Sequence, residues 1–443
     1  MSTPARVGWA LACLAIVLLA LRISLDGRGE GDLRPFYDAS SRLNTGLDLY
    51  QRTEEPANPK RPTGYLYLPP FALLFWPLTA LPFGAVRFIW YVLCGGVALR
   101  TWANAWWLLA PTRGPPVGEG ERPWAGHSKR ALLVAVIGVL AALRYVLADL
   151  NHSQANLLTI GLAVEGVVQL ERGRLRWGTF FLALGTVFKL VPALLVLGYL
   201  LRGRWKVALW SAGWGVGMVL LSGPALWAHG YPLGTLPDYI WRFLTEITPH
   251  NRNHQLPMPT NSALSAWLAH MLSGVAKPGE PVEVVWGSWP WSVAYRWGTV
   301  VSLTAFAGWS LWAWRAPAAA DSRWRAATLL AAVPWITPVA TKPHLSCLLL
   351  PMLAGARLAV LGGRGRVLAA LGLLCLGLGS RGVIGKMPSV HWSVYGGVTL
   401  GLVLLGLGLA LAEPPLHEAS ADPALQEPRS ATNASAGEAD ARD

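Results

Sequence analysis

The chain has 443 residues, of which 53% are hydrophobic and only 14% charged. An ordinary soluble domain carries about 25% charged residues, so this composition excludes a soluble globular protein. The formal net charge of +13 could indicate a nucleic-acid-binding protein, but the Lys and Arg residues lie in short loops between apolar runs, which argues against it.

The apolar residues occur in long runs that predict helices crossing a membrane. A span needs about 20 residues, and a lone segment in lipid must be helical to satisfy its own backbone hydrogen bonds. The predicted spans are residues 7–25, 84–109, 131–148, 154–170, 207–228, 291–314, 326–341, 344–358, 367–380 and 393–412, with short helices at 69–82 and 261–272. The first run lacks a cleavage site and is interpreted as an uncleaved span.

These runs predict an all-α polytopic membrane protein with about ten spans. Residues 1–412 form one membrane domain, and residues 413–443 form an acidic tail rich in Pro, Ala and Ser. Such a tail has little apolar surface to bury, so we expect it to be disordered.

The run at 177–201 is interrupted by Lys189 and Pro192 and has basic residues on both flanks. Proline removes a helical hydrogen bond and favours a break. The favoured interpretation is a pair of half-helices that enter and leave on the cytoplasmic side, with Lys189 near their apex. A single span with one loop on the unexpected side is the alternative.

Short loops rich in Lys and Arg mark the cytoplasmic side of a membrane protein. Five such loops share one side in the predicted path: residues 111–130, 171–176, 202–206, 315–325 and 357–366. The tail then lies inside, and loops 26–67 and 229–290 lie outside.

Polar residues gather on the external side of this path. They are Asp32, Tyr37 and Asp38 in the first loop, His152, Gln154 and Asn156 in the next turn, Arg252, His254 and Asn261 in the large loop, and Lys342 and His344 in a late turn. Taken alone, each of these residues is explained as a polar group in a solvated loop. The late turn is too short to solvate Lys342 and His344 fully, and ionisable groups at membrane depth are functional candidates by default.

A site with one acidic residue and several cationic residues fits glycosyl transfer from a lipid-phosphate sugar. An acceptor hydroxyl needs one general base, whereas a phosphate leaving group needs positive charge and no proton. A hydrolase with two carboxylates would need a well-placed pair. Asp32 and Asp38 are six positions apart, which does not place them on one helix face.

Four motifs occur in a familiar order. They are Asp32…Tyr37-Asp38-Ala39…Gly46…Tyr50, Leu68-Pro69-Pro70, Gln154-Ala155-Asn156 and Lys189-Leu190-Val191-Pro192. In this order they resemble glycosyltransferase family 87, of the GT-C superfamily of membrane glycosyltransferases. The resemblance implies a GT-C-like helical bundle, a polyprenyl-phosphate sugar donor, often mannose, and a catalytic aspartate at Asp32.

The chain departs from this family pattern in two places. The later Asn-Gln or Asn-Ser segment is represented only by Asn261-Ser262, and Glu30 is a rival to Asp32 as the base. We expect Lys342, His344, Lys189 and Arg252 to hold the donor phosphate. We expect Tyr37, Asp38, His152, Gln154, Asn156, His254 and Asn261 to contact sugar or acceptor.

The leading hypothesis is therefore a hexosyltransferase of the bacterial cytoplasmic membrane with its active site on the external face. Its expected partners are the lipid-linked donor, a lipid or glycan acceptor and membrane lipids, but not nucleic acid. No metal or cofactor motif occurs, since the four Cys residues lie in apolar runs without ligand spacing. The alternatives are a lipid-linked glycan ligase, which would need no essential acid, and a lipid or solute transporter, which should show internal repeats.

Overall fold

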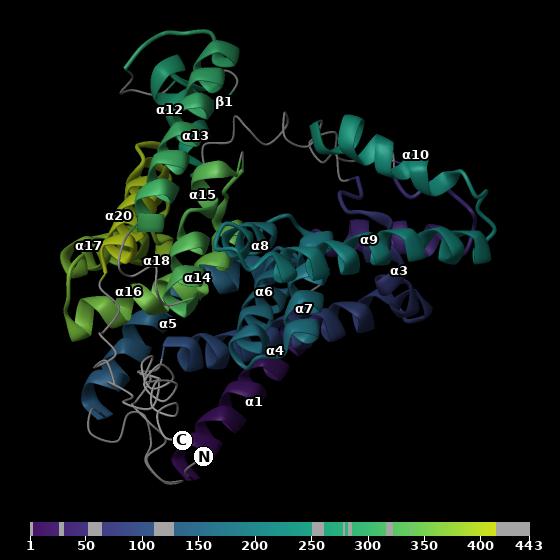
Figure 1. Ribbon diagram of the computed structural model, residues 1–443, viewed down its shortest axis with the longest axis horizontal. Coiled ribbons are helices and arrows are strands. Elements are labelled where there is room, and N and C mark those ends of the chain that lie inside the picture. Colours follow the sequence, from purple (N-terminus) through teal and green to yellow (C-terminus); the bar gives the residue numbers. More distant parts are fainter. Residues whose placement is uncertain are drawn as a thin grey trace, which may run out of the picture.

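The computed structural model describes residues 3–25, 31–51, 64–109, 128–249, 261–277, 280–281, 286–315, 322–337 and 339–412. Glu30, Arg252, His254 and the tail 413–443 lie outside the described residues. The predicted all-α class is confirmed, because helices form almost every described element (Figure 1). The exception is a short antiparallel pair of strands, β1 (Val275–Lys277) and β2 (Glu280–Pro281).

The first part of the chain consists of two long helices joined by short ones. These are α1 (Thr3–Leu25), α2 (Leu33–Arg42), α3 (Pro69–Phe75), the 3-10 helix η1 (Trp76–Ala80) and α4 (Phe83–Leu109). Helix α1 packs along α4 and leaves leucines such as Leu11 and Leu18 exposed. Exposed leucines on a span face lipid, as the sequence predicts.

The central part carries the elements that build the polar cluster described below. They are α5 (Ser128–Asn151), α6 (Asn156–Glu171), α7 (Leu175–Phe188), α8 (Ala193–Leu200), α9 (Trp205–Ala228), α10 (Thr235–Arg242) and the π-helical segment η2 (Phe243–Ile247). Helix α6 packs on both α4 and α7, and most of its residues are buried.

The last part has shorter helices, several of them interrupted. They are α12 (Leu264–Ser273), α13 (Trp291–Arg315), α14 (Ser322–Ala331), α15 (Val333–Ile336), η4 (Lys342–Leu348), α16 (Leu349–Leu361), α17 (Arg366–Leu378), α18 (Arg381–Ile384), α19 (Lys386–Val394) and α20 (Gly397–Leu411). In Figure 1, α12 and α13 form the top of the molecule, and α16, α17 and α20 lie together at its left.

Among the described residues, five helices are long and apolar enough to cross a membrane: Val7–Leu25, Phe83–Leu109, Lys129–Asn151, Trp205–Ala228 and Lys342–Leu361. The pair Pro388–Val394 and Gly397–Leu411, bent by 57°, would make a sixth. The predicted span 291–314 forms one continuous helix of 25 residues, α13, although it is not among these five. The remaining predicted spans are shorter or broken; residues 326–341, for example, are divided between α14 and α15. The polytopic architecture is thus confirmed, and the number of about ten spans stays a prediction.

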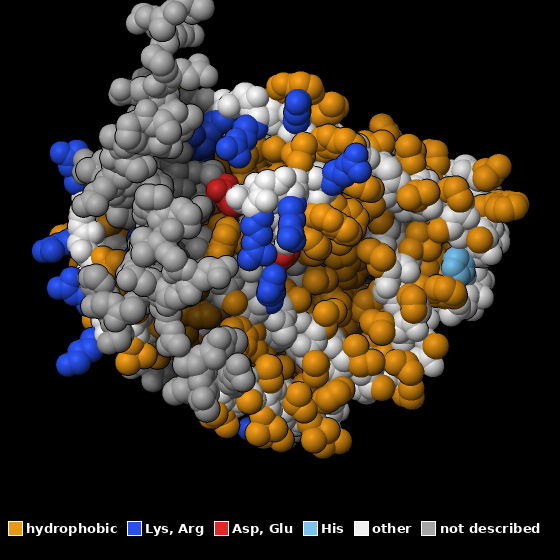
Figure 2. Space-filling model, turned by 60° about the horizontal axis from the view of Figure 1, so that its bottom comes forward, with side chains coloured by type: hydrophobic (Ala, Val, Ile, Leu, Met, Phe, Trp, Pro, Cys, Tyr) orange, Lys and Arg blue, Asp and Glu red, His pale blue; other side chains and the backbone are white. Residues whose placement is uncertain are grey.

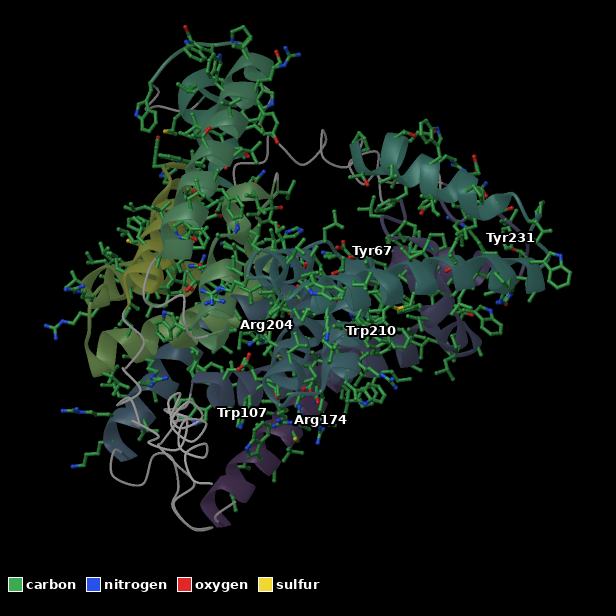
Figure 3. The ribbon with its side chains drawn as sticks, in the orientation of Figure 1. Tyr67, Trp107, Arg174, Arg204, Trp210 and Tyr231 are labelled. Atoms are coloured by element: carbon green, nitrogen blue, oxygen red, sulfur yellow. The ribbon has the colours of Figure 1, made fainter. Side chains whose placement is uncertain are left out.

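The predicted division of residues 177–201 is confirmed, because α7 ends at Phe188 and α8 begins at Ala193. Arg176 lies over the Trp210 ring, and Phe180 contacts Trp214 four residues further along each helix, so α7 and α9 run parallel (Figure 3 labels Trp210). Two parallel helices begin at the same side, so the chain must return between them. This arrangement supports the pair of half-helices over a single span.

Hydrophobic side chains cover much of the face shown in Figure 2, around a group of Lys and Arg side chains. Inside the molecule, one large apolar core joins α5, α6, α14, α16 and α20. A second core is rich in aromatic residues and joins α2, α3 and α4, with Phe36 and Phe71 at its centre. The polar cluster lies where these two cores meet.

Candidate functional site

The cluster is built on Asp149, whose carboxylate joins the end of α5 to the start of α6. Its side chain is 0% exposed. Oδ1 accepts a hydrogen bond from Asn156 Nδ2 at 2.6 Å, and Oδ2 accepts one from the Leu157 backbone N–H at 3.2 Å. The carboxylate therefore caps the N-terminus of α6, where the helix dipole favours negative charge.

Asn156 links this carboxylate to Lys189. Its amide nitrogen also donates to Gln154 Oε1 at 2.5 Å, and its oxygen accepts from Lys189 Nζ at 2.5 Å. Lys189 reaches this position because it lies in the break after α7, in an extended conformation. The predicted residues Gln154, Asn156 and Lys189 are thus brought together around Asp149.

Asp32 is held against the same turn through its backbone. Its N–H donates to the His152 carbonyl at 2.9 Å. Gly31 precedes it with φ +54°, and a Cβ there would lie 2.3 Å from the His152 oxygen, so only glycine fits. The Asp32 carboxylate lies within electrostatic range of Tyr67, Asp149 and Lys189.

Asp32 occupies the N-cap position of α2, but its side chain makes no capping hydrogen bond there. The simple explanation of this residue, that it serves to cap a helix, is therefore not what the structure shows. Its side chain is half-buried, in contrast to that of Asp149.

Tyr67, which is labelled in Figure 3, places an aromatic ring beside Lys189. Lys189 Nζ lies 5.8 Å from the centre of its ring, which adds a cation–π attraction. Burial raises the pKa of the Tyr67 phenol well above its ordinary value, and the carboxylates of Asp32 and Asp149 raise it further. The phenol therefore stays protonated and uncharged beside the lysine.

The predicted late turn closes the cluster. His344 Nδ1 lies 2.8 Å from Thr341 Oγ1, and its ring is within electrostatic range of Lys189 and His152. Lys342 begins η4 two residues before His344 and is half-buried. The exposed His152 lies at the rim, where its Nδ1 is 2.8 Å from the Ala148 carbonyl oxygen.

Three predicted residues have supporting contacts away from this centre. Asn261 is 1% exposed, and its Oδ1 accepts from the backbone N–H groups of Ala340 and Ala263, at 2.8 and 3.1 Å. It therefore fixes the segment that precedes the late turn. Tyr37 donates to the Leu81 carbonyl at 3.1 Å, and Asp38 pairs with Arg34 at 2.8 Å.

The sequence argument missed Asp149 and Tyr67. A signal for Asp149 was present, because a carboxylate at the end of an apolar run is costly unless it is paired. Tyr67 carries no such signal, since a Tyr close to a span is equally typical of the membrane interface.

An apolar groove runs beside the late turn, between α12, α19 and α20. Its volume is about 810 Å³, and its lining includes Leu264, Trp267, Trp392, Leu400 and Val403. A second pocket of about 420 Å³ shares Leu264 and Val403 and continues along α13 past Gly308. The Thr399 hydroxyl, in the groove lining, donates to the Ser262 carbonyl at 3.2 Å, and Ser262 N–H donates to the Ala340 carbonyl at 2.9 Å. These bonds connect the groove to the turn that carries His344.

The acidic and basic groups of the cluster do not form a metal-binding set. In the part of the chain that the structure describes, no group of three or more His, Cys, Asp or Glu residues could hold a metal ion.

Comparison with protein-family models identifies glycosyltransferase family 87 over residues 65–351. A search of curated proteins gives no match. The matched region includes Tyr67, Asp149, Asn156, Lys189 and His344, and it begins after Asp32. Because the match covers more than half of the chain, and the described helices include several of span length, the protein is a membrane glycosyltransferase that belongs to glycosyltransferase family 87.

Proposed function

We propose that the protein transfers a hexose, most simply mannose, from a polyprenyl-phosphate sugar to a lipid or glycan acceptor at the external face of the cytoplasmic membrane. One observation carries this proposal. A carboxylate from the first loop, Asp32, lies within electrostatic range of a lysine, Lys189, that is held in a helix break. A displacement at an anomeric carbon with a phosphate leaving group needs one base and one cation of this kind.

In the proposed reaction, Asp32 accepts the proton of the acceptor hydroxyl as its oxygen attacks the anomeric carbon. The bond between that carbon and the phosphate oxygen breaks, and the polyprenyl phosphate leaves with the bonding electrons. Lys189 and His344 stabilise the charge that develops on the phosphate. A single displacement of this kind inverts the anomeric centre.

Asp32 suits the role of base better than Asp149. Both oxygens of Asp149 accept hydrogen bonds from protein groups, and its side chain is 0% exposed. Asp32 is only half-buried, so an acceptor can approach it, whereas Asp149 is fully enclosed.

The apolar groove is an argument for a lipid-linked donor, because it can hold an isoprenoid chain. Its lining joins the segment that holds the late turn, through Thr399 and Ser262. An isoprenoid chain seated there would leave its phosphate near Lys342 and His344. Each buried methylene contributes about 0.8 kcal/mol, so a long chain can anchor the donor without sugar-specific contacts.

The proposal is tested with purified protein, candidate polyprenyl-phosphate sugars and mass spectrometry of the products. We expect transfer with the wild type and loss of transfer, with donor binding retained, in Asp32→Asn. A lipid-linked glycan ligase needs no essential acid, so normal turnover per folded molecule of both Asp32→Asn and Glu30→Gln would favour the ligase. Normal turnover of Asp32→Asn together with an inactive Glu30→Gln would identify Glu30 as the general base.

A further inference from the structure

Every described side-chain contact of Asn156 depends on the orientation of its amide. Its nitrogen faces two acceptors, the Asp149 carboxylate and Gln154 Oε1, and its oxygen faces the donor Lys189 Nζ. Turning the amide over would set oxygen against oxygen on one side and nitrogen against nitrogen on the other. Asp149 and Lys189 therefore favour the same orientation of the amide, with its oxygen towards the lysine.

We infer that Asp149 is a positioning residue for Lys189 and acts through the Asn156 amide. The carboxylate polarises the amide, and a polarised amide oxygen is a stronger acceptor for the ammonium group. An amide between the two charges also keeps them apart. A direct ion pair would neutralise Lys189, whereas this relay holds the ammonium in place and leaves its other N–H groups for an anion.

This inference rests on the proposed function in one respect, namely that the anion is the phosphate of the sugar donor. The positioning itself does not depend on the donor. Asp149 also caps α6 through Leu157 N–H, so a loss of stability alone would not distinguish positioning from capping. The two roles are separable because Asn156→Ala removes the relay and leaves the contact between Asp149 and Leu157.

The test measures how fast Lys189 is acetylated by a small amine-reactive ester, with peptide mass spectrometry as the readout. Lys206, at the start of α9, serves as the internal reference. We expect Asp149→Asn and Asn156→Ala to change the labelling rate of Lys189 several-fold and to leave that of Lys206 unchanged. Unchanged labelling of Lys189 in Asn156→Ala would overturn the inference, whatever donor the enzyme uses.

The exchanged variant Asp149→Asn with Asn156→Asp gives a second, independent test. In this variant the new amide at 149 can donate to the carboxylate at 156 and accept from Leu157 N–H, and the carboxylate can accept from Lys189. The total charge is unchanged. The carboxylate then contacts Lys189 directly, so we expect the labelling rate of Lys189 to recover from the value of Asp149→Asn towards that of the wild type, while kcat stays low because a direct ion pair neutralises the ammonium group. No recovery of labelling would contradict positioning, and a wild-type kcat would contradict the need to keep the two charges apart. An absence of hexose transfer by the wild type, with these labelling results, would contradict only the proposed function.

Discussion

Helix α6 has a polar cluster at each end, and the two clusters are built differently. At its N-terminal end, called the outer end because the predicted path places it outside, Asp149 is linked to Lys189 through an amide, and Asp32 lies nearby. Towards its C-terminal end, called the inner end, Glu165 accepts directly from Arg100 at 3.1 Å and from Asn104 at 2.6 Å.

In the inner cluster, this direct pairing already occupies the Glu165 carboxylate. Glu165 also accepts from Gln169 at 2.6 Å, and the Arg100 side chain is 60% exposed while that of Glu165 is 14% exposed. A carboxylate with a direct cationic partner and two amide donors has little capacity for a ligand. The outer cluster instead holds two carboxylates around one lysine. The comparison therefore favours the outer cluster over the inner one as the place where a ligand can bind.

The largest expected effect comes from removing the base at the outer end. Asp32→Asn keeps the shape and should lower turnover per folded molecule by about 10²–10⁴-fold, the usual cost of losing a general base. Radiolabelled sugar transfer measures this loss. The matched control is Glu165→Gln at the inner end, which should keep near-normal turnover; an equal loss in both variants would remove the distinction between the two clusters.

Removing the outer cation should have the next largest effect. Lys189→Met preserves much of the side-chain length and should lower kcat by about 10²–10³-fold, as for the loss of one group that stabilises a developing anion. Arg100→Met is the corresponding change at the inner end and should alter kcat little. Steady-state kinetics at saturating donor compare the two, and a kcat of Lys189→Met near that of the wild type would exclude Lys189 from the reaction.

Filling the groove should have a moderate effect that is confined to lipid binding. Gly308 lines the second pocket, and no atom lies within 4 Å of a Cβ placed there. Gly308→Phe should raise the donor KM about tenfold, because displaced methylenes contribute about 0.8 kcal/mol each.

Gly213→Phe on α9 is the matched control, since a Cβ there also meets no atom within 4 Å. Kinetics with full-length and short-chain donors check the prediction. An equal KM in the two variants would show that the isoprenoid chain lies elsewhere.

The smallest expected effect is on stability at the inner end. Glu165→Gln removes an ion pair whose arginine is largely exposed, so we expect a loss of about 0.2–1 kcal/mol in the free energy of unfolding. Thermal unfolding in detergent measures it. A much larger loss would show that this pair, although exposed, is coupled to the packing of α4 against α6.

The sequence determined the local features of this protein. Long apolar runs require helices in lipid, and Pro192 together with Lys189 predicts the break between α7 and α8, because proline interrupts helical hydrogen bonding. The same local reasoning identified the turn with Gln154 and Asn156. It predicted that Lys189 and His344 hold the same donor phosphate, and the structure brings the two side chains within electrostatic range.

The tertiary structure decided which of these side chains meet. Asp149 meets Asn156 across the turn between α5 and α6, and Tyr67 reaches Lys189 across more than a hundred residues of chain. Asn261, whose contact with sugar or acceptor stays a prediction, holds the backbone before the late turn. Membrane helices are formed by local hydrogen bonding, whereas the partners of their polar residues depend on contacts between distant segments, which periodicity and loop charge do not encode.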